Sequence, residues 1–76
     1  MPKGTIKRLF PDHGFGFIKT EYGDDLFFYR TALEGAGYRV DFNSLREGQQ
    51  VEFVVGKGSD GLRRAVGVWV IQLKAN

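Results

Sequence analysis

The sequence predicts an all-β protein, a small antiparallel barrel of five strands. Eleven glycines interrupt the 76 residues every few positions. The short runs between them are rich in valine, isoleucine, phenylalanine and tyrosine, which favour strands. No segment of useful length repeats its apolar residues with the period of a helix. Because a chain this short buries a limited core, closure into a barrel uses it well and removes the open sheet edges.

Five strands are expected in one domain that covers residues 1–76, with the barrel over about 3–73. The turns between them are rich in proline, glycine and aspartate, and the strongest is the hairpin loop 57–61. A longer irregular stretch, 31–49, begins with one helical turn at 31–34. The strands are expected at about 4–10, 14–20, 25–30, 50–56 and 63–73.

Alternation along each strand separates an inner face from an outer face. The inner set is expected to fill the barrel with Ile6, Ile18, Leu26, Phe28, Val51, Phe53, Val55, Val66, Val68 and Val70. Four rings of the second and third strands are left over, and each shares its face with a charged residue. These rings are Phe15, Phe17, Phe27 and Tyr29. Two neighbouring strands would place them on one outer patch.

This outer aromatic patch has two interpretations. The rings either form a second layer over the core, stabilised by cross-strand pairing, or they bind a ligand, because an exposed apolar patch is otherwise a liability. Cations lie among them in the sequence, namely Lys7, His13, Lys19 and Arg30. Rings that stack on bases, with cations that contact phosphates, suit a nucleic acid.

The motifs that carry these residues resemble the cold-shock domain of bacterial cold-shock proteins. GFGFI at 14–18 matches the family's first ribonucleoprotein motif, and DLFFY at 25–29 lies where its second is found. GAGY at 35–38 and SLREGQQVEF at 44–53 follow in the family's order. The resemblance covers 4–70. The RNA-recognition motif is set aside, because there a similar string follows the other motif and lies between helices.

The resemblance implies an OB-fold, a Greek-key barrel of five antiparallel strands, with single-stranded RNA or DNA lying across the first three. It implies an RNA chaperone of low sequence specificity that keeps strands unpaired and can thereby affect transcription or translation. Lys7 would lie near phosphates, and Asp25 would accept a hydrogen bond from a base. Tyr29 stands where the family usually has histidine. The implied stacking rings are Phe15, Phe17, Phe27 and Tyr38.

Several residues depart from the family pattern at the implied binding site. Arg8 and Leu9 replace tryptophan and phenylalanine, and Arg30 replaces a stacking phenylalanine, so the site exchanges rings for guanidinium groups that also stack. Strict alternation points Arg8 inward, so a bulge must turn it outward. Phe10, in place of asparagine, either restores a ring or packs. His13, in place of lysine, is either a turn residue or a weak base contact.

Three further features lie outside these motifs. Residues 40–43 look like a four-residue insertion in the long loop, which Phe42 is expected to anchor. Trp69 is expected to point outward from the last strand and cover neighbouring structure rather than stack on a base. Arg63 and Arg64 either extend the basic surface or are solvated charges beside a hairpin.

Composition argues against an enzyme. The chain has no cysteine and one histidine, and its carboxylates show no paired pattern, so neither a nucleophile with its base nor a metal site is expected. No cofactor, small-molecule substrate or membrane segment is expected either, and a cytoplasmic location is the default. The net charge of +2 argues only weakly for a polyanion. The competing class is an OB-fold module that binds proteins and has lost part of its nucleic-acid site.

Overall fold

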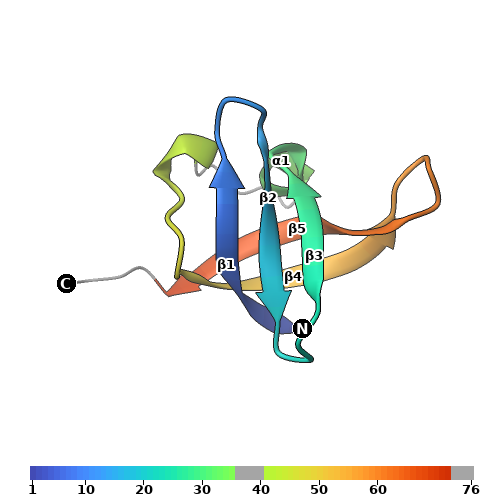
Figure 1. Cartoon of the computed structure of the whole chain (residues 1–76), viewed down its shortest axis with the longest axis horizontal. Coiled ribbons are helices and arrows are strands. Elements are labelled where there is room, and N and C mark those ends of the chain that lie inside the picture. Colours follow the sequence, from blue (N-terminus) through green and yellow to red (C-terminus); the bar gives the residue numbers. More distant parts are fainter. Residues whose placement is uncertain (36–40, 73–76) are drawn as a thin grey trace.

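The computed structural model describes residues 1–35 and 41–72. Within these residues the chain forms five strands, one short helix and one 3₁₀ turn (Figure 1). The expected strands and the helical turn are confirmed, with bounds that differ by at most one residue. In chain order the elements are β1 (Lys3–Phe10), β2 (Phe15–Thr20), β3 (Asp25–Tyr29), α1 (Thr31–Gly35), η1 (Phe42–Ser44), β4 (Gln50–Lys57) and β5 (Arg63–Gln72).

The strands close into a barrel in the order β1-β2-β3-β5-β4. β1, β2 and β3 lie side by side as a meander, and β4 and β5 cross behind them (Figure 1). β1 pairs antiparallel with β2 and β4, β2 with β3, and β4 with β5. The barrel closes through one short parallel pairing, in which Phe28 of β3 lies opposite Ala65 of β5. The five-stranded barrel is therefore confirmed. Among the described residues, all strand pairings are antiparallel except the pairing of β3 with β5.

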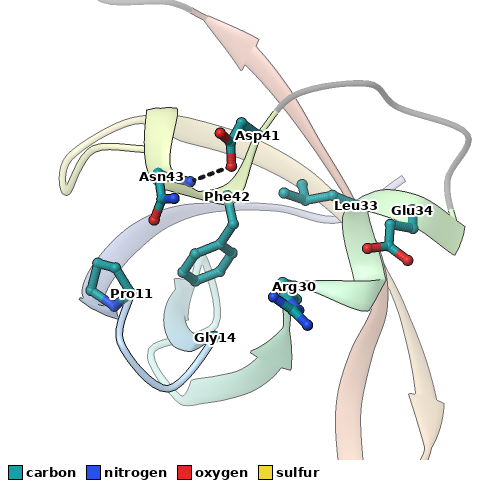
Figure 2. Close-up of a pocket in the computed structure, with 8 residues that line it drawn as sticks. All are labelled: Pro11, Gly14, Arg30, Leu33, Glu34, Asp41, Phe42 and Asn43. Carbon is teal, nitrogen blue, oxygen red and sulfur yellow. Dashed lines mark hydrogen bonds between the residues drawn. The ribbon is translucent and has the colours of Figure 1, made fainter.

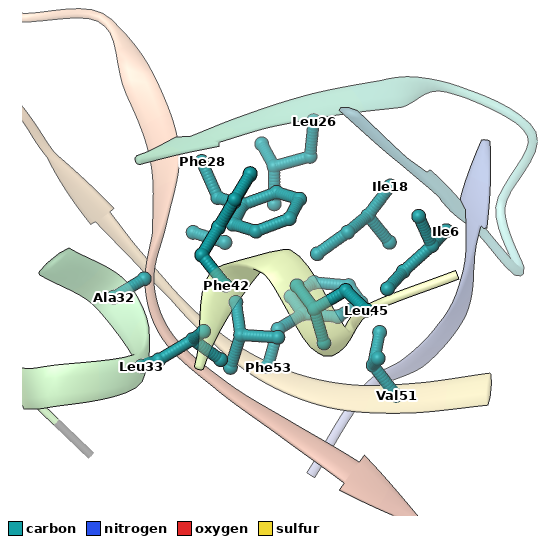
Figure 3. Packing of buried hydrophobic residues seen from close by; sticks show 12 residues of the cluster. Ile6, Ile18, Leu26, Phe28, Ala32, Leu33, Phe42, Leu45, Val51 and Phe53 are labelled. Carbon is teal, nitrogen blue, oxygen red and sulfur yellow. The ribbon is translucent and has the colours of Figure 1, made fainter. Parts of the chain in front are cut away.

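The core fills the barrel and continues under the helix and the 3₁₀ turn. Most of the expected inward residues are buried, and Val70 packs partly against them. Helix α1 adds Ala32 and Leu33, while the segment around η1 adds Phe42 and Leu45, whose side chains enter the cluster in Figure 3. The cluster comprises Ile6, Ile18, Leu26, Phe28, Ala32, Leu33, Phe42, Leu45, Val51, Phe53, Ala65 and Val68.

Phe42 anchors the loop, as expected from the sequence. Its side chain is buried, and its ring centroid lies 5.9 Å from that of Phe28. Asp41 caps the 3₁₀ turn, because its carboxylate accepts a hydrogen bond from the backbone N–H of Asn43 at 3.1 Å. The buried ring and the cap together fix residues 41–44 across one end of the barrel.

The prediction of a buried position is wrong for two of the expected core residues. Val55 is 39% exposed and Val66 is 42% exposed. The β4–β5 register shifts between Val54 and Val55, and a bulge of this kind breaks the alternation on which the prediction rested. Ala65 is buried instead, opposite Val55, and Val66 lies against Gly56 on the outer side.

Trp69 lies on β5, opposite Glu52 of β4, and is half-buried. Its ring packs over Gly67, where a β-carbon would come within 3.2 Å of the indole. This placement agrees with a covering role on the β4–β5 side of the barrel.

Candidate nucleic-acid interface

Five rings gather on the outer surface of the β1–β2–β3 meander. Pairing of β2 with β3 sets Phe15 opposite Tyr29 and Phe17 opposite Phe27. Pairing of β1 with β2 adds Phe10, which lies opposite Phe15. None of these rings belongs to the buried core cluster, so the barrel is filled without them. We call the set Phe10, Phe15, Phe17, Phe27 and Tyr29 the aromatic face.

The rings of the aromatic face support one another. Phe15 and Phe27 are stacked, with centroids 5.2 Å apart and planes 29° from parallel. Phe17 and Tyr29 meet Phe27 edge-on, at 5.6 Å and 4.6 Å. Because tilted and edge-to-face contacts are the favourable ones between rings, the cluster holds its shape without a ligand. Mutual packing also explains why the four phenylalanines are half-buried although they lie outside the core.

Phe10 belongs to this face. Its centroid lies 4.8 Å from that of Phe15 and 6.3 Å from that of Phe17. The guanidinium carbon of Arg8 lies 5.1 Å from the centre of the Phe10 ring, within the range of a cation–π contact. Of the two interpretations of Phe10, the added ring is the one that this geometry supports.

A bulge in β1 sets two successive cations outward. Ile6 pairs with Ile18 and Arg8 with Phe17, so Lys7 is the extra residue between them. Ile6 is buried, whereas Lys7 and Arg8 are both exposed. The bulge expected from the sequence is therefore confirmed, and it moves Arg8 onto the same side as Phe17.

The strands meet closely beside this bulge. A β-carbon added to Gly16 would lie 2.7 Å from the Arg8 carbonyl oxygen and 3.0 Å from the Phe28 ring. Only glycine fits such an approach without a shift of the backbone. Gly16 therefore lets β1 and β2 pack tightly at the point where the outer face carries its rings.

Lys7 and Asp25 form an ion pair at the edge of the aromatic face. The Lys7 Nζ donates to Asp25 Oδ2 at 2.8 Å. Lys19 lies opposite Asp25 on β2 and is exposed. Since exposed ion pairs of this kind contribute about 0–1 kcal/mol, the pair separates at small cost when a phosphate or a base competes.

His13 and Arg30 lie toward the opposite end of the meander. The His13 ring is 5.9 Å from that of Phe15 and extends the row of rings into the β1–β2 turn. Arg30 is exposed, and its side chain lies against Gly14, where it lines a cavity of about 210 Å³ together with residues of α1 and of the segment around η1 (Figure 2). The cation–π contacts found among residues 1–35 and 41–72 come from Arg8 and Arg64 instead. Tyr38 lies outside the described residues.

Arg64, whose role the sequence left undecided, lies beside the rings of the aromatic face. Its guanidinium carbon lies 5.8 Å from the Phe27 centroid and 5.2 Å from that of Tyr29. The Arg64 Nη2 contacts both carboxylate oxygens of Asp60 at 3.3 Å. A backbone hydrogen bond from Leu62, reinforced by the Arg64 charge, lowers the pKa of Asp60, so the pair stays ionised at neutral pH.

The described residues contain no cluster of three or more groups able to hold a metal ion. None of the helices that the structure describes has the length and apolar character needed to span a bilayer.

Comparison with known families identifies this barrel. Residues 2–71 match the profile of the 'Cold-shock' DNA-binding domain. The chain belongs to the cold-shock domain family. It is 46% identical over 61 residues to cold shock protein CspD of Bacillus subtilis, an alignment that covers 80% of this chain and 86% of that protein.

Two further relatives give the same picture. This cold-shock domain is 47% identical over 60 residues to the major cold shock protein CspA of Pseudomonas aeruginosa, covering 79% of the chain and 81% of that protein. It is 43% identical over 72 residues to probable cold shock protein A of Mycolicibacterium smegmatis, covering 93% and 100%. The family consists of nucleic-acid binders without enzymatic activity, so the aromatic face of this cold-shock domain fits a nucleic-acid partner.

Proposed function

We propose that this cold-shock domain binds single-stranded nucleic acid with low sequence specificity and acts as an RNA chaperone that keeps strands unpaired. The observation that carries the proposal is the aromatic face, five rings that lie outside the core and next to the outward cations of the β1 bulge. A strand held in this way can affect transcription or translation, since both depend on whether RNA is paired.

Single strands fit the aromatic face better than duplexes do. The faces of bases in a duplex are covered by their neighbours, whereas an unpaired strand can present each base to a ring. Stacking on a ring contributes about 1–3 kcal/mol per base and is tolerant of sequence, because every base has a π-face. A row of rings with few hydrogen-bonding groups therefore binds many sequences with similar affinity.

The proposed contacts divide by chemistry. The rings of the aromatic face stack on bases, with Tyr38 added on the strength of the family pattern. Lys7 and Arg8 contact phosphates beside Phe17, and Asp25 accepts a hydrogen bond from a base edge after it separates from Lys7. His13 and Arg30 contact the strand where it leaves the rings at the β1–β2 turn.

The chaperone activity follows from mass action and needs no ATP. A ligand that binds only the unpaired form shifts the equilibrium toward that form by an amount that grows with its free concentration. Each base captured on the aromatic face exchanges pairing in the duplex for stacking on a ring. Binding of moderate affinity suits this role, because the strand must also be released.

A direct test compares a fluorescent pyrimidine-rich strand, made as RNA and as DNA, with the matching duplexes at two salt concentrations. The single strand is expected to bind more tightly at both, and its affinity should fall as salt rises because counterions are released from phosphates. Equal affinity for duplex and single strand would instead indicate a generic basic surface. Binding of neither, together with salt-independent capture of a protein, would favour the protein-interaction module.

A further inference from the structure

The outer face of β4 and β5 is an exposed apolar surface. Val54 is 38% exposed, Ile71 is 40% exposed, and Trp69 is half-buried. The Trp69 ring lies over Gly67, and a β-carbon added to that glycine would also come within 3.8 Å of the Val54 side chain, so tryptophan and valine form one continuous patch. Such a patch costs free energy in water unless something covers it.

This face lies on the other side of the barrel from the aromatic face, because β4 and β5 cross behind the β1–β2–β3 meander (Figure 1). Its tryptophan has a carboxylate beside it, since Glu52 lies directly opposite Trp69 in the β4–β5 pairing. A phosphate placed over this ring would face that negative charge. The face therefore suits a protein partner better than a nucleic acid.

The charges on this face are arranged for contact with a second copy of the chain. Lys3 of β1 lies opposite Glu52, and Glu52 lies opposite Trp69, so a cation, a carboxylate and a ring form one row across three strands. Neither Lys3 nor Glu52 takes part in the ion pairs found within residues 1–35 and 41–72. A rotation of 180° about an axis parallel to β4 reverses this row, which sets each Lys3 over Trp69 of the partner subunit. A lysine over an indole ring is a favourable cation–π contact, and a two-fold interface makes it twice.

The same rotation places Val54 at the centre of the contact. Val54 follows Glu52 by two residues on β4, so it shares the outer face and lies on the axis, where it meets Val54 of the partner subunit. The two Glu52 carboxylates also lie near the axis, with a Lys3 ammonium beside each of them. Because each row carries no net charge, the apolar contact is not opposed by repulsion between the copies.

The size of the face sets the strength of this contact. The 8 residues of β4 and the 10 residues of β5 extend over about 26–33 Å, and three neighbouring strands span about 15 Å. Each copy then contributes roughly 400–500 Å², and two copies together bury roughly 800–1,000 Å². Interfaces of this size are at the lower limit for specific complexes, so the dimer is reversible, with a Kd of about 10–100 µM.

We propose that the outer face of β4 and β5 is an interface with a second copy of this chain, in which the two barrels pack back to back about a two-fold axis through Val54. Both aromatic faces then point outward, so the dimer carries two strand-binding surfaces instead of one. The inference goes beyond the proposed function and does not depend on it, because no residue proposed to contact the strand lies on this face.

The test is sedimentation equilibrium of the protein alone from about 1 to 500 µM. The wild type is expected to change from monomer to dimer over this range, and its emission should shift to shorter wavelength as the only tryptophan, Trp69, loses contact with water. Val54→Lys and Val54→Glu each place like charges together on the axis, so each should raise the Kd at least about tenfold. An equimolar mixture of the two variants should dimerise again, because the lysine of one then meets the glutamate of the other. Leu62→Lys, which changes a 66% exposed apolar residue outside this face, is the matched control and should dimerise as the wild type does.

Three results would overturn the proposal. A wild type that stays monomeric over the whole range would mean that no second copy covers this face. Dimerisation of Val54→Lys with the wild-type Kd would mean that the copies meet through another surface. If both Val54 variants are folded by circular dichroism and their mixture stays monomeric, Val54 does not lie on a two-fold axis. Strand binding, measured separately at protein concentrations below the Kd, tests the proposed function and is unaffected by any of these results.

Discussion

Phe27 and Phe28 are adjacent residues on opposite faces of β3, and they provide a matched test of the aromatic face. Phe28 is 0% exposed within the core, whereas Phe27 is half-buried at the centre of the outer ring cluster. The same substitution to alanine at the two positions should therefore give opposite results. Phe27→Ala should weaken binding with a small loss of stability, and Phe28→Ala should lose stability with little change in binding.

The expected losses of stability follow from burial. Phe28→Ala removes a buried ring and leaves a cavity, which costs about 3–5 kcal/mol. Phe27→Ala leaves no enclosed cavity. It loses roughly half of the free energy gained by burying a phenylalanine side chain, together with the contacts to neighbouring rings, about 1–2.5 kcal/mol in all. The free energy of unfolding of a domain of 76 residues is roughly 4–11 kcal/mol in total. At about 4–8 °C per kcal/mol, Phe28→Ala should lower Tm by at least about 12 °C, clearly more than Phe27→Ala.

The expected losses of affinity run the other way. Phe27→Ala removes one stacking partner and should weaken binding of a pyrimidine-rich strand by about 1–3 kcal/mol, or roughly 5- to 150-fold. Phe28→Ala, measured well below its Tm, should bind within about threefold of the wild type, a difference of about 0.7 kcal/mol. Thermal unfolding by circular dichroism and titration with a labelled strand provide the two measurements.

One result would refute this reasoning at Phe27. If Phe27→Ala lowers Tm as much as Phe28→Ala and leaves affinity for the strand unchanged, the ring is a second core layer and not a stacking surface. Should Phe28→Ala fail to fold, Phe28→Leu replaces it as the control, since it keeps most of the apolar volume.

The remaining predictions concern charge, backbone packing and pH. Arg8→Gln should reduce the slope of log affinity against log salt concentration by about 0.7, because one phosphate contact is lost. Lys3→Gln on the same strand is the control and should reduce this slope less. Equal reductions would mean that Arg8 contributes only general positive charge. Gly16→Ala should lower stability by about 1–3 kcal/mol in thermal melts, because its methyl group would clash with the Arg8 carbonyl, and an unchanged Tm would contradict that approach. The Thr20 hydroxyl donates a hydrogen bond to the Asp24 carboxylate and lowers the pKa of that carboxyl. This hydrogen bond therefore stabilises the folded state at pH values above the ordinary aspartate pKa, and the stabilisation is lost as the pH falls through the lowered pKa of the folded state. Carboxyl titration by NMR should show the lowered midpoint, and Thr20→Val should return it toward the ordinary value.

Much of the aromatic face could be predicted from local sequence. Side chains alternate along a strand, and β2 and β3 are joined by a turn of four residues, so strands that follow each other also pair. These two rules placed Phe15, Phe17, Phe27 and Tyr29 on one outer surface, and the observed register confirms that placement. The outward position of Arg8 was also predictable, because an arginine among core residues of a small barrel requires a bulge.

Departures from alternation in the second half of the barrel could not be predicted in the same way. Val55 and Val66 read as inward residues, yet the register shift in β4–β5 exposes both and buries Ala65. A small residue fits at Ala65 because β3 pairs with β5 there, with Phe28 directly opposite. The small side chain of Ala65 is visible in the sequence, but the reason for it lies in β3, which is distant in the sequence and packs against this position.

The sequence by itself determined the barrel class, the five strands and four of the five rings of the aromatic face, because each of these follows from local alternation and short turns, whereas the place of Phe10 was left open. Only the tertiary structure decided what lies next to that cluster. Closure of the barrel brings β5 alongside β3 and sets Arg64 over Phe27 and Tyr29, and packing of α1 and η1 at the barrel end brings their residues to the same cavity as Arg30. Such neighbours come from contacts between distant segments, which depend on the register and bulges of the whole sheet.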